Sequence, residues 1–205
     1  MLYLPTVTQV VIDCVDVIRA EKVIAYNLAM CEFASSKVLS SQYSDSSLVH
    51  HIPGISSLSE YSTFCLRQLI HHVDTEHVLV CQHDGFIRHP SKWDPVFLQY
   101  DYVGAPWLPD PTFVTTGGAP WCPGVGPNVG NGGFSLRSRR LQQFLSVCPI
   151  LIDSGLEDVD IAVNNRPLLD RLGFRFAPEA VARNFSWETG PERESFGTHG
   201  RFVIC

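Results

Sequence analysis

The stretch from His77 to Gly85, with the sequence HVLVCQHDG, decides the fold. Val78 to Cys81 form a short apolar run, which is typical of a strand buried in a parallel sheet. Polar residues end the run at Gln82-His83-Asp84, and a glycine follows at once. In open parallel sheets, ligands bind beyond the carboxyl ends of the strands. We therefore expect an α/β fold whose ligand site includes Asp84.

The residues before this stretch show the same pattern of strand and helix. The run Val7 to Ile12 (VTQVVI) predicts another buried strand, and it also ends in a carboxylate, Asp13. Asp16 is placed to cap a helix that reaches Ala29, and residues 35–39 predict the next strand. Two expected strands thus end in carboxylates.

A second helix is predicted between these strands and His77. Ser57 and Glu60 have the spacing of a capping box. Apolar residues then recur every four positions from Tyr61 to Val73, which indicates one apolar helical face. The resulting order β-α-β-α-β predicts a mainly parallel central sheet flanked by helices.

Shorter elements are predicted in the second half of the chain. Residues 106–128 are rich in Pro and Gly, and so long a loop is usually functional or mobile. The other expected elements are a helix over 93–100, a strand at 102–104, a strand at 134–136, a helix over 138–147, a helix over 157–172 kinked near Pro167, and a strand at 174–176.

Composition favours one folded domain and excludes several classes of protein. The chain has 205 residues, of which 45% are hydrophobic and 18% charged. A formal net charge of −6 argues against a nucleic-acid-binding protein. The 7 cysteines form no CxxC pair, which argues against a zinc finger and suits a reducing compartment. With no apolar run long enough for a membrane span and no signal-peptide pattern, we expect a cytoplasmic protein.

Three further segments carry candidate site residues, each with two interpretations. The glycines of Gly130 to Ser135 (GNGGFS) allow a ligand close to the backbone, or they form an ordinary turn. Glu157-Asp158 at a helix start supply a general base, or they only complement the helix dipole. His199 between glycines is a Mn²⁺ ligand or a surface residue. Asp84 likewise is a metal ligand or a turn cap.

Arginine and tryptophan side chains add two weaker candidates. Arg137, Arg139 and Arg140 stand at the start of an expected helix, where they form a solvated face or bind phosphate. Trp107 and Trp121 could stack on a sugar or pack in the protein.

Five segments occur in an order that resembles one family over roughly residues 7–200. They are Gln82–Phe86 (QHDGF), Tyr100–Trp107 (YDYVGAPW), Val129–Ser138 (VGNGGFSLRS), Glu157–Val159 (EDV) and Phe196–Gly200 (FGTHG). The chain resembles a poorly characterised family of GT-A-type glycosyltransferases. The resemblance implies a single Rossmann-related domain, with a nucleotide-binding half at about residues 1–105 and an acceptor and catalytic half at about 106–205.

The resemblance also implies a site for a nucleotide-diphosphate sugar, most commonly a UDP-sugar, with Mn²⁺ or Mg²⁺. The Asp-x-Asp motif of such enzymes aligns with Gln82-His83-Asp84, so only Asp84 carries over as a carboxylate ligand. His199 matches the second metal ligand. The expected donor-binding residues are Asp13, His83, Asn131, Gly132 and Gly133.

Catalytic roles follow from the same resemblance. Asp158, or in second place Glu157, matches the base of inverting members, which takes a proton from the acceptor hydroxyl. Asp101 is an alternative second carboxylate for a double displacement.

Two other functions stay open on the sequence alone. A nucleotide-sugar or carbohydrate-binding domain without turnover is favoured by the Gln82 replacement. A metal-dependent phosphohydrolase uses a similar strand-end carboxylate site, although it usually needs more carboxylate or His ligands.

Overall fold

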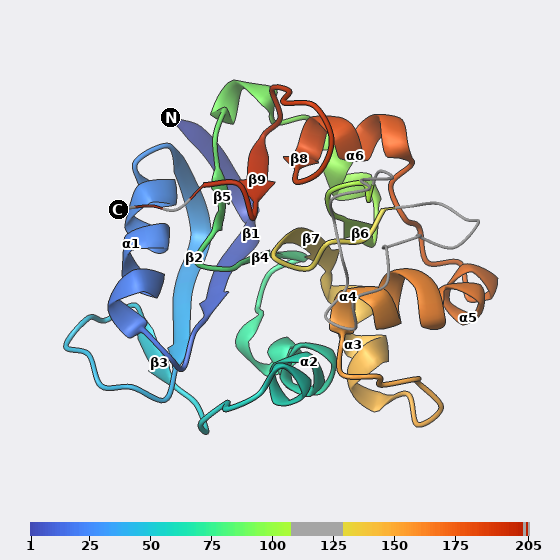
Figure 1. Ribbon diagram of the computed structural model, residues 1–205, viewed down its shortest axis with the longest axis horizontal. Helices are drawn as coiled ribbons and strands as arrows, with labels where there is room; N and C mark the ends of the chain where they lie inside the picture. Colours follow the sequence, from blue (N-terminus) through green and yellow to red (C-terminus); the bar gives the residue numbers. More distant parts are fainter. Residues whose placement is uncertain (108–128, 203, 205) are drawn as a thin grey trace.

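A central six-stranded sheet with order β3-β2-β1-β4-β7-β6 organises the computed structural model, which describes residues 1–107, 129–202 and 204 (Figure 1). Four of its strands, β3, β2, β1 and β4, run parallel, whereas β7 runs antiparallel to both of its neighbours, β4 and β6. The strands are β1 (Leu2–Ile12), β2 (Cys31–Ser40), β3 (Val49–His51), β4 (His77–Cys81), β6 (Tyr102–Val103) and β7 (Phe134–Ser138).

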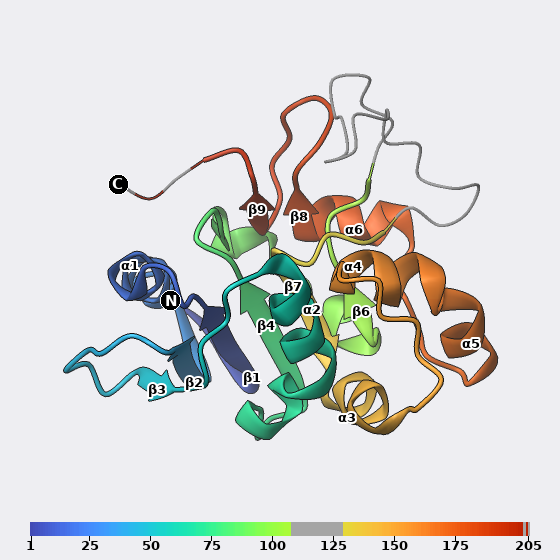
Figure 2. The same ribbon diagram turned by 60° about the horizontal axis from the view of Figure 1, so that its bottom comes forward.

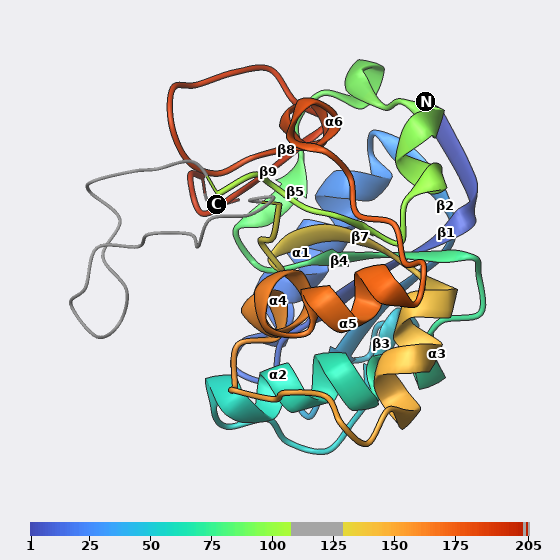
Figure 3. The ribbon, with the colours of Figure 1, turned by 90° about the vertical axis from the view of Figure 1, so that its right-hand side faces the viewer.

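Helices cover both faces of this sheet, as Figure 3 shows for α2 and α6 on opposite sides of β4 and β7. The helices are α1 (Val17–Leu28), α2 (Leu58–Arg67), α3 (Arg139–Val147), α4 (Glu157–Val159), α5 (Arg166–Arg171) and α6 (Glu179–Phe185). Short 3-10 helices span Leu69–His72, Pro90–Lys92 and Pro95–Gln99, and a π-helix spans Asp160–Asn164. The expected α/β fold with a mainly parallel central sheet is confirmed.

Alternation along the strands divides the core into two layers. Because successive side chains of a strand point to opposite faces, Leu79 of β4 packs in the layer beneath α1, while Val78 and Val80 pack beneath α2. A third cluster joins Tyr102 to α3 and α5. Burial on both faces explains why the central strands have continuous apolar sequences.

A small second sheet brings the end of the chain to the carboxyl end of β4. Its strands, in the order β5-β9-β8, are β5 (Gly85–Ile87), β9 (Gly197–His199) and β8 (Ser186–Trp187). Gly85 pairs with His199, and the N–H of Gly200 donates to the carbonyl of Asp84 at 3.1 Å. Figure 2 shows β8 and β9 beside β4 and β7. The sequence did not predict this sheet, β3 or α6.

Two helices start at the predicted capping residues, Asp16 and Ser57, and a third starts at Ser138, which was not predicted as a cap. The side chains of Asp16, Ser57 and Ser138 each accept a hydrogen bond from a backbone N–H three residues later. Glu60 accepts from the N–H of Ser56 at 2.7 Å, one residue earlier than a capping box requires. The expected helix over 93–100 is the 3-10 helix Pro95–Gln99.

Two predictions for the second half need correction. The helix expected over 157–172 is broken into α4, the π-helix and α5, because Pro167 has no N–H to continue a helix and instead lies in the first turn of α5. The strand expected at 174–176 does not form, and Phe176 makes only an isolated bridge to Tyr102. Residues 106–107 are described, but the rest of the predicted loop, including Trp121, lies outside the described residues. No helix in the described ranges has the length and apolarity to cross a membrane.

Truncating the core of β4 tests this packing. Leu79 is fully buried, so Leu79→Ala should lower the free energy of unfolding by about 2–5 kcal/mol, as measured by urea denaturation. The control Val147→Ala removes an exposed side chain at the end of α3 and should change it by less than about 0.5 kcal/mol. A loss below about 1 kcal/mol for Leu79→Ala would contradict the assigned layer.

Candidate functional site

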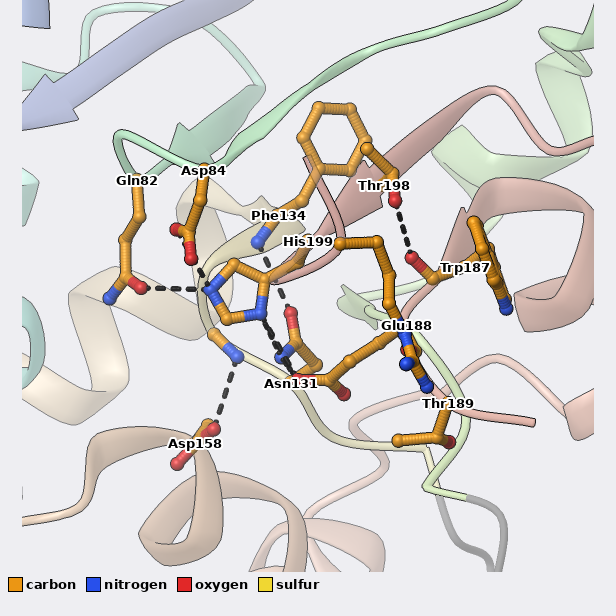
Figure 4. Close-up of polar contacts among 12 residues, drawn as sticks. Gln82, Asp84, Asn131, Phe134, Asp158, Trp187, Glu188, Thr189, Thr198 and His199 are labelled. Atoms are coloured by element: carbon orange, nitrogen blue, oxygen red, sulfur yellow. Dashed lines mark hydrogen bonds and ion pairs between the residues drawn. The ribbon is translucent and has the colours of Figure 1, made fainter. Parts of the chain in front are cut away.

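His199 lies at the centre of a polar cluster at the carboxyl end of β4 (Figure 4). Its Nε2 is 3.0 Å from Oε1 of Gln82 and 3.3 Å from Oδ1 of Asp84. β5 pairs with β9 directly after the Gln82–Asp84 turn, which explains how residues 117 positions apart meet. The structure therefore brings together both residues that the sequence predicted as metal ligands.

The other edge of the same ring faces Glu188 and Asn131. Nδ1 of His199 is 3.1 Å from Oε1 of Glu188 and 2.8 Å from Nδ2 of Asn131. The Asn131 amide also donates to that Glu188 oxygen at 2.5 Å. Glu188 follows β8 directly and was not predicted, because no recognisable motif surrounds it.

The glycine-rich turn before β7 fits closely between this cluster and α4. A Cβ on Gly133 would overlap the imidazole of His199, and one on Gly132 would overlap the carboxylate of Glu157. Asn131 has a φ of +33° and closes the turn by accepting from the N–H of Phe134 at 3.2 Å. The groups that lie close to these glycines are protein side chains, so the expected close approach of a ligand stays a prediction.

Asp158 lies on the opposite side of this turn from His199. Its Oδ2 accepts from the N–H of Gly132 at 3.2 Å, and its Oδ1 accepts from the N–H of Val159 at 2.8 Å. Figure 4 shows the carboxyl group on the helix side of the turn. The neighbouring Glu157 is buried instead, so the two adjacent acids have different surroundings.

Arg137 was expected at a helix start with Arg139 and Arg140, and for Arg137 this prediction is wrong. It lies in β7, with its side chain fully buried, and its NH2 is 3.1 Å from Oε1 of Glu157. A buried charge needs a partner, and Glu157 supplies it. Arg139 starts α3 and donates to the carbonyl of Val73, while Arg140 stacks on an aromatic ring. The alternation of β7 could have indicated the inward position of Arg137.

Burial and charge shift the pKa values of three side chains around the glycine turn, which are His199, Asp84 and Glu157. Burial lowers the pKa of His199, but hydrogen bonds and charge from Asp84 and Glu188 outweigh it and raise this pKa from 6.5 to about 10. Burial alone would raise the pKa of Asp84, yet His199 holds it below its usual value. Burial and the charge of Asp158 raise the pKa of Glu157 to about 7, against the effect of Arg137.

A cavity of about 350 Å³ lies beside the cluster. Asp13, Arg19, Tyr61, Gln82 and His83 are among the residues that line it. Asp13 is therefore near the strand-end site but outside the His199 cluster. Its carboxylate is bound by Arg19 at 2.7 Å and by two N–H groups of its own loop. Nδ1 of His83 is 3.9 Å from Oδ1 of Asp84.

Two other residues singled out in the sequence, Asp101 and Trp107, are buried and contact other parts of the protein. Asp101 is buried, and its Oδ1 accepts from the hydroxyl of Ser138 at 2.5 Å while its Oδ2 accepts from the N–H of Arg175 at 2.8 Å, so both its oxygens are engaged within the protein. Trp107 is buried, and its ring fills the space next to Gly130.

The donor atoms at the Nε2 edge fit a divalent cation. Oδ1 of Asp84 is buried 3.3 Å from Nε2 of His199, and the Gln82 amide oxygen lies beside the same nitrogen at 3.0 Å. Oxygen and imidazole ligands suit Mn²⁺ and Mg²⁺. No group of three His, Cys, Asp or Glu side chains suited to a metal occurs in the described part of the chain, so an amide or substrate oxygen must complete the set.

Comparisons with known proteins identify a family and the fold. The model of a family described as "Protein of unknown function (DUF5672)" matches residues 47–199. No curated protein sequence matches the chain.

Solved structures share the fold at low sequence identity. Glucosyl-3-phosphoglycerate synthase from Mycobacterium tuberculosis, in complex with Mg²⁺ and UDP, is 17% identical over 84% of this chain and 68% of its own, with a TM-score of 0.50. Bifunctional IspDF from Campylobacter jejuni is 13% identical over 83% and 48%, also with a TM-score of 0.50. The mannosyltransferase PcManGT from Pyrobaculum calidifontis, in complex with GDP-Man and Mn²⁺, is 14% identical over 86% and 55%, with a TM-score of 0.48.

These likenesses show a GT-A-like, Rossmann-related α/β fold. The chain spans about half the length of IspDF and of the mannosyltransferase.

Removing one partner of the buried Arg137–Glu157 pair should destabilise the protein more than removing both charges. Arg137→Met leaves Glu157 buried without its partner and should cost about 3–5 kcal/mol of unfolding free energy. Adding Glu157→Gln should recover part of that loss, as a double-mutant cycle in urea would measure. Additive effects of the two substitutions would contradict direct pairing.

The raised pKa of His199 predicts a pH-dependent contribution to stability. The folded pKa of about 10 exceeds the ordinary 6.5, so the contribution is complete below about pH 6.5 and is lost as pH rises towards about 10. In the presence of a chelator, the stability difference between the parent and His199→Gln should therefore shrink over that range. His51→Gln, at an exposed position, is the control, and a difference independent of pH would contradict the prediction.

Proposed function

We propose that this chain, which belongs to the family described as "Protein of unknown function (DUF5672)", is a glycosyltransferase. It moves a sugar from a nucleotide-diphosphate sugar, of which a UDP-sugar is the first candidate, to an acceptor hydroxyl. The observation that carries the proposal is the meeting of Asp84 and His199 at the carboxyl end of β4. Ligands of open parallel sheets bind at this end, and the adjacent cavity has room for part of a donor.

The two halves of the chain contribute different parts of the proposed donor site. Asp84 and His83 come from the first half, next to the cavity. The turn at Asn131–Gly133 comes from the second half and lies against His199. Asp84 and His199 would hold Mn²⁺ or Mg²⁺, which when bound supplies positive charge for the diphosphate leaving group.

Asp158 is the better candidate of the two adjacent acids for the base. Its carboxylate is partly exposed and is fixed by two backbone N–H groups, whereas Glu157 is engaged by Arg137. Asp158 would take the proton of the acceptor hydroxyl as the acceptor oxygen bonds to C1 of the sugar and the C1–O bond to the diphosphate breaks. One base and no covalent nucleophile give inversion.

The alternatives from the sequence have less support in the geometry. A phosphohydrolase with two metal ions needs several convergent carboxylates and histidines, and such a cluster is absent from residues 1–107 and 129–202. A binding domain without turnover has no need of Asp158 beside the glycine turn. The proposal for a transferase therefore rests on Asp158 as well as on the Asp84–His199 pair.

Nucleoside diphosphates should stabilise the protein in a metal-dependent way. A ligand that binds only the folded state raises the unfolding free energy by about 2.7 kcal/mol at 100 times its dissociation constant. We expect a rise in melting temperature with UDP and Mn²⁺ together that is lost in Asp84→Ala. An equal rise in melting temperature with and without Mn²⁺ would show that donor binding does not need the metal. No rise with any nucleoside diphosphate would contradict the donor site.

Substitution of Asp158 should separate binding from transfer. Asp158→Asn keeps the size of the side chain but removes the base, so transfer to an acceptor should fall by about 10²–10⁴-fold with donor binding retained. Product analysis by mass spectrometry and donor titration measure the two effects. Asp74→Asn, an exposed carboxylate, is the control. Transfer by Asp158→Asn at the parent rate would show that another group is the base.

A further inference from the structure

The imidazole of His199 has two edges with different partners. Gln82 and Asp84 face Nε2, both through oxygen atoms. Glu188 and Asn131 face Nδ1 from the opposite edge, as Figure 4 shows. The carboxylate of Glu188 thus lies away from the atoms that fit a cation. The imidazole ring of His199 stands between Glu188 and those atoms.

The orientation of Asn131 is fixed by the backbone around it. Its Oδ1 accepts from the N–H of Phe134 at 3.2 Å, so its Nδ2 must point to Glu188 and His199. The hydroxyl of Tyr102 donates to the Asn131 carbonyl at 3.1 Å and holds the main chain. Asn131 therefore orients the Glu188 carboxylate, to which it donates at 2.5 Å.

Glu188 decides which nitrogen of His199 carries a proton in the bound state. A hydrogen bond to a carboxylate is roughly twice as strong as one between neutral groups. With a cation on Nε2, the carboxylate therefore favours the tautomer in which Nδ1 donates to Glu188 across 3.1 Å. The roles of Nδ1 and Asn131 Nδ2, which are 2.8 Å apart, depend on that tautomer. With Nδ1 protonated, Nε2 is the nitrogen that can offer a lone pair beside Asp84.

The Nε2 edge has a single carboxylate, Asp84, beside the neutral amide of Gln82. We propose that Glu188 is a positioning residue for this edge: it fixes His199 through Nδ1 and makes Nε2 a stronger ligand for a divalent cation held with Asp84. This inference rests on the proposed function, because it concerns the same metal site.

Mn²⁺ alone, titrated into the full chain, is the probe for this proposal. Electron paramagnetic resonance of free Mn²⁺ gives the affinity, and electron spin echo modulation of bound Mn²⁺ detects a directly coordinated nitrogen. We expect a nitrogen ligand in the parent and in the control Glu192→Gln, whose carboxylate is exposed and pairs with Arg88. Glu188→Gln should bind Mn²⁺ about 10–100-fold more weakly and should lose or weaken the nitrogen signal.

Equal affinity and an unchanged nitrogen signal in Glu188→Gln would overturn the inference. So would a parent protein that binds Mn²⁺ without a nitrogen ligand, or does not bind it. Stabilisation of the parent by UDP at saturating Mn²⁺ judges the glycosyltransferase proposal separately, because it reports donor binding whichever atoms coordinate the ion, so the two failures are distinguishable.

A second variant covers the case in which Glu188→Gln does not fold. Glu188→Asp keeps the charge but withdraws it from Nδ1 by one methylene group. It should retain the nitrogen signal and bind Mn²⁺ more weakly than the parent. Parent-like affinity in Glu188→Asp, with correct folding confirmed by circular dichroism, would contradict a role that depends on the contact with Nδ1.

Discussion

The close approach of Gly132 and Gly133 to their neighbours is the constraint on which the site depends. Side chains at these positions would occupy the places of the Glu157 carboxylate and the His199 ring. Their absence lets one turn lie between β9 and α4. The proposed cation ligands and the proposed base Asp158 consequently meet opposite sides of a single rigid segment, which keeps donor and acceptor chemistry close together.

The charges around this turn are unequal, and the imbalance suits a cation. Three carboxylates, Asp84, Glu157 and Glu188, surround the turn with little exposure to solvent, opposite Arg137 and His199. Buried charges are costly unless they are paired, and Arg137 is committed to Glu157. Among the described residues, Asp84 faces two imidazole groups, His199 at 3.3 Å and His83 at 3.9 Å, so a bound divalent ion would add positive charge there.

The sequence predicted the strands and helices that have a local apolar pattern. It missed contacts between segments that are far apart in the chain. The apolar runs at Val7 and Val78 identified the parallel core because burial on both faces leaves a continuous apolar sequence. Asp84 and His199, which the sequence singled out together, lie 3.3 Å apart, and their role as metal ligands stays a prediction. Glu188 could not be found in the same way, because its role arises from β8 and β9 lying beside β7, a contact without a local sequence signal. The inward position of Arg137, by contrast, could have been read from the alternation of β7.

The most direct test of the site as a whole is crystallographic. Crystals of the protein grown with Mn²⁺ and UDP should be measured near the manganese absorption edge. The account predicts an anomalous difference peak beside Asp84 Oδ1 and His199 Nε2, with diphosphate density reaching it from the cavity next to Gln82 and His83. A bound diphosphate with no peak at that place, or a manganese peak elsewhere, would contradict it.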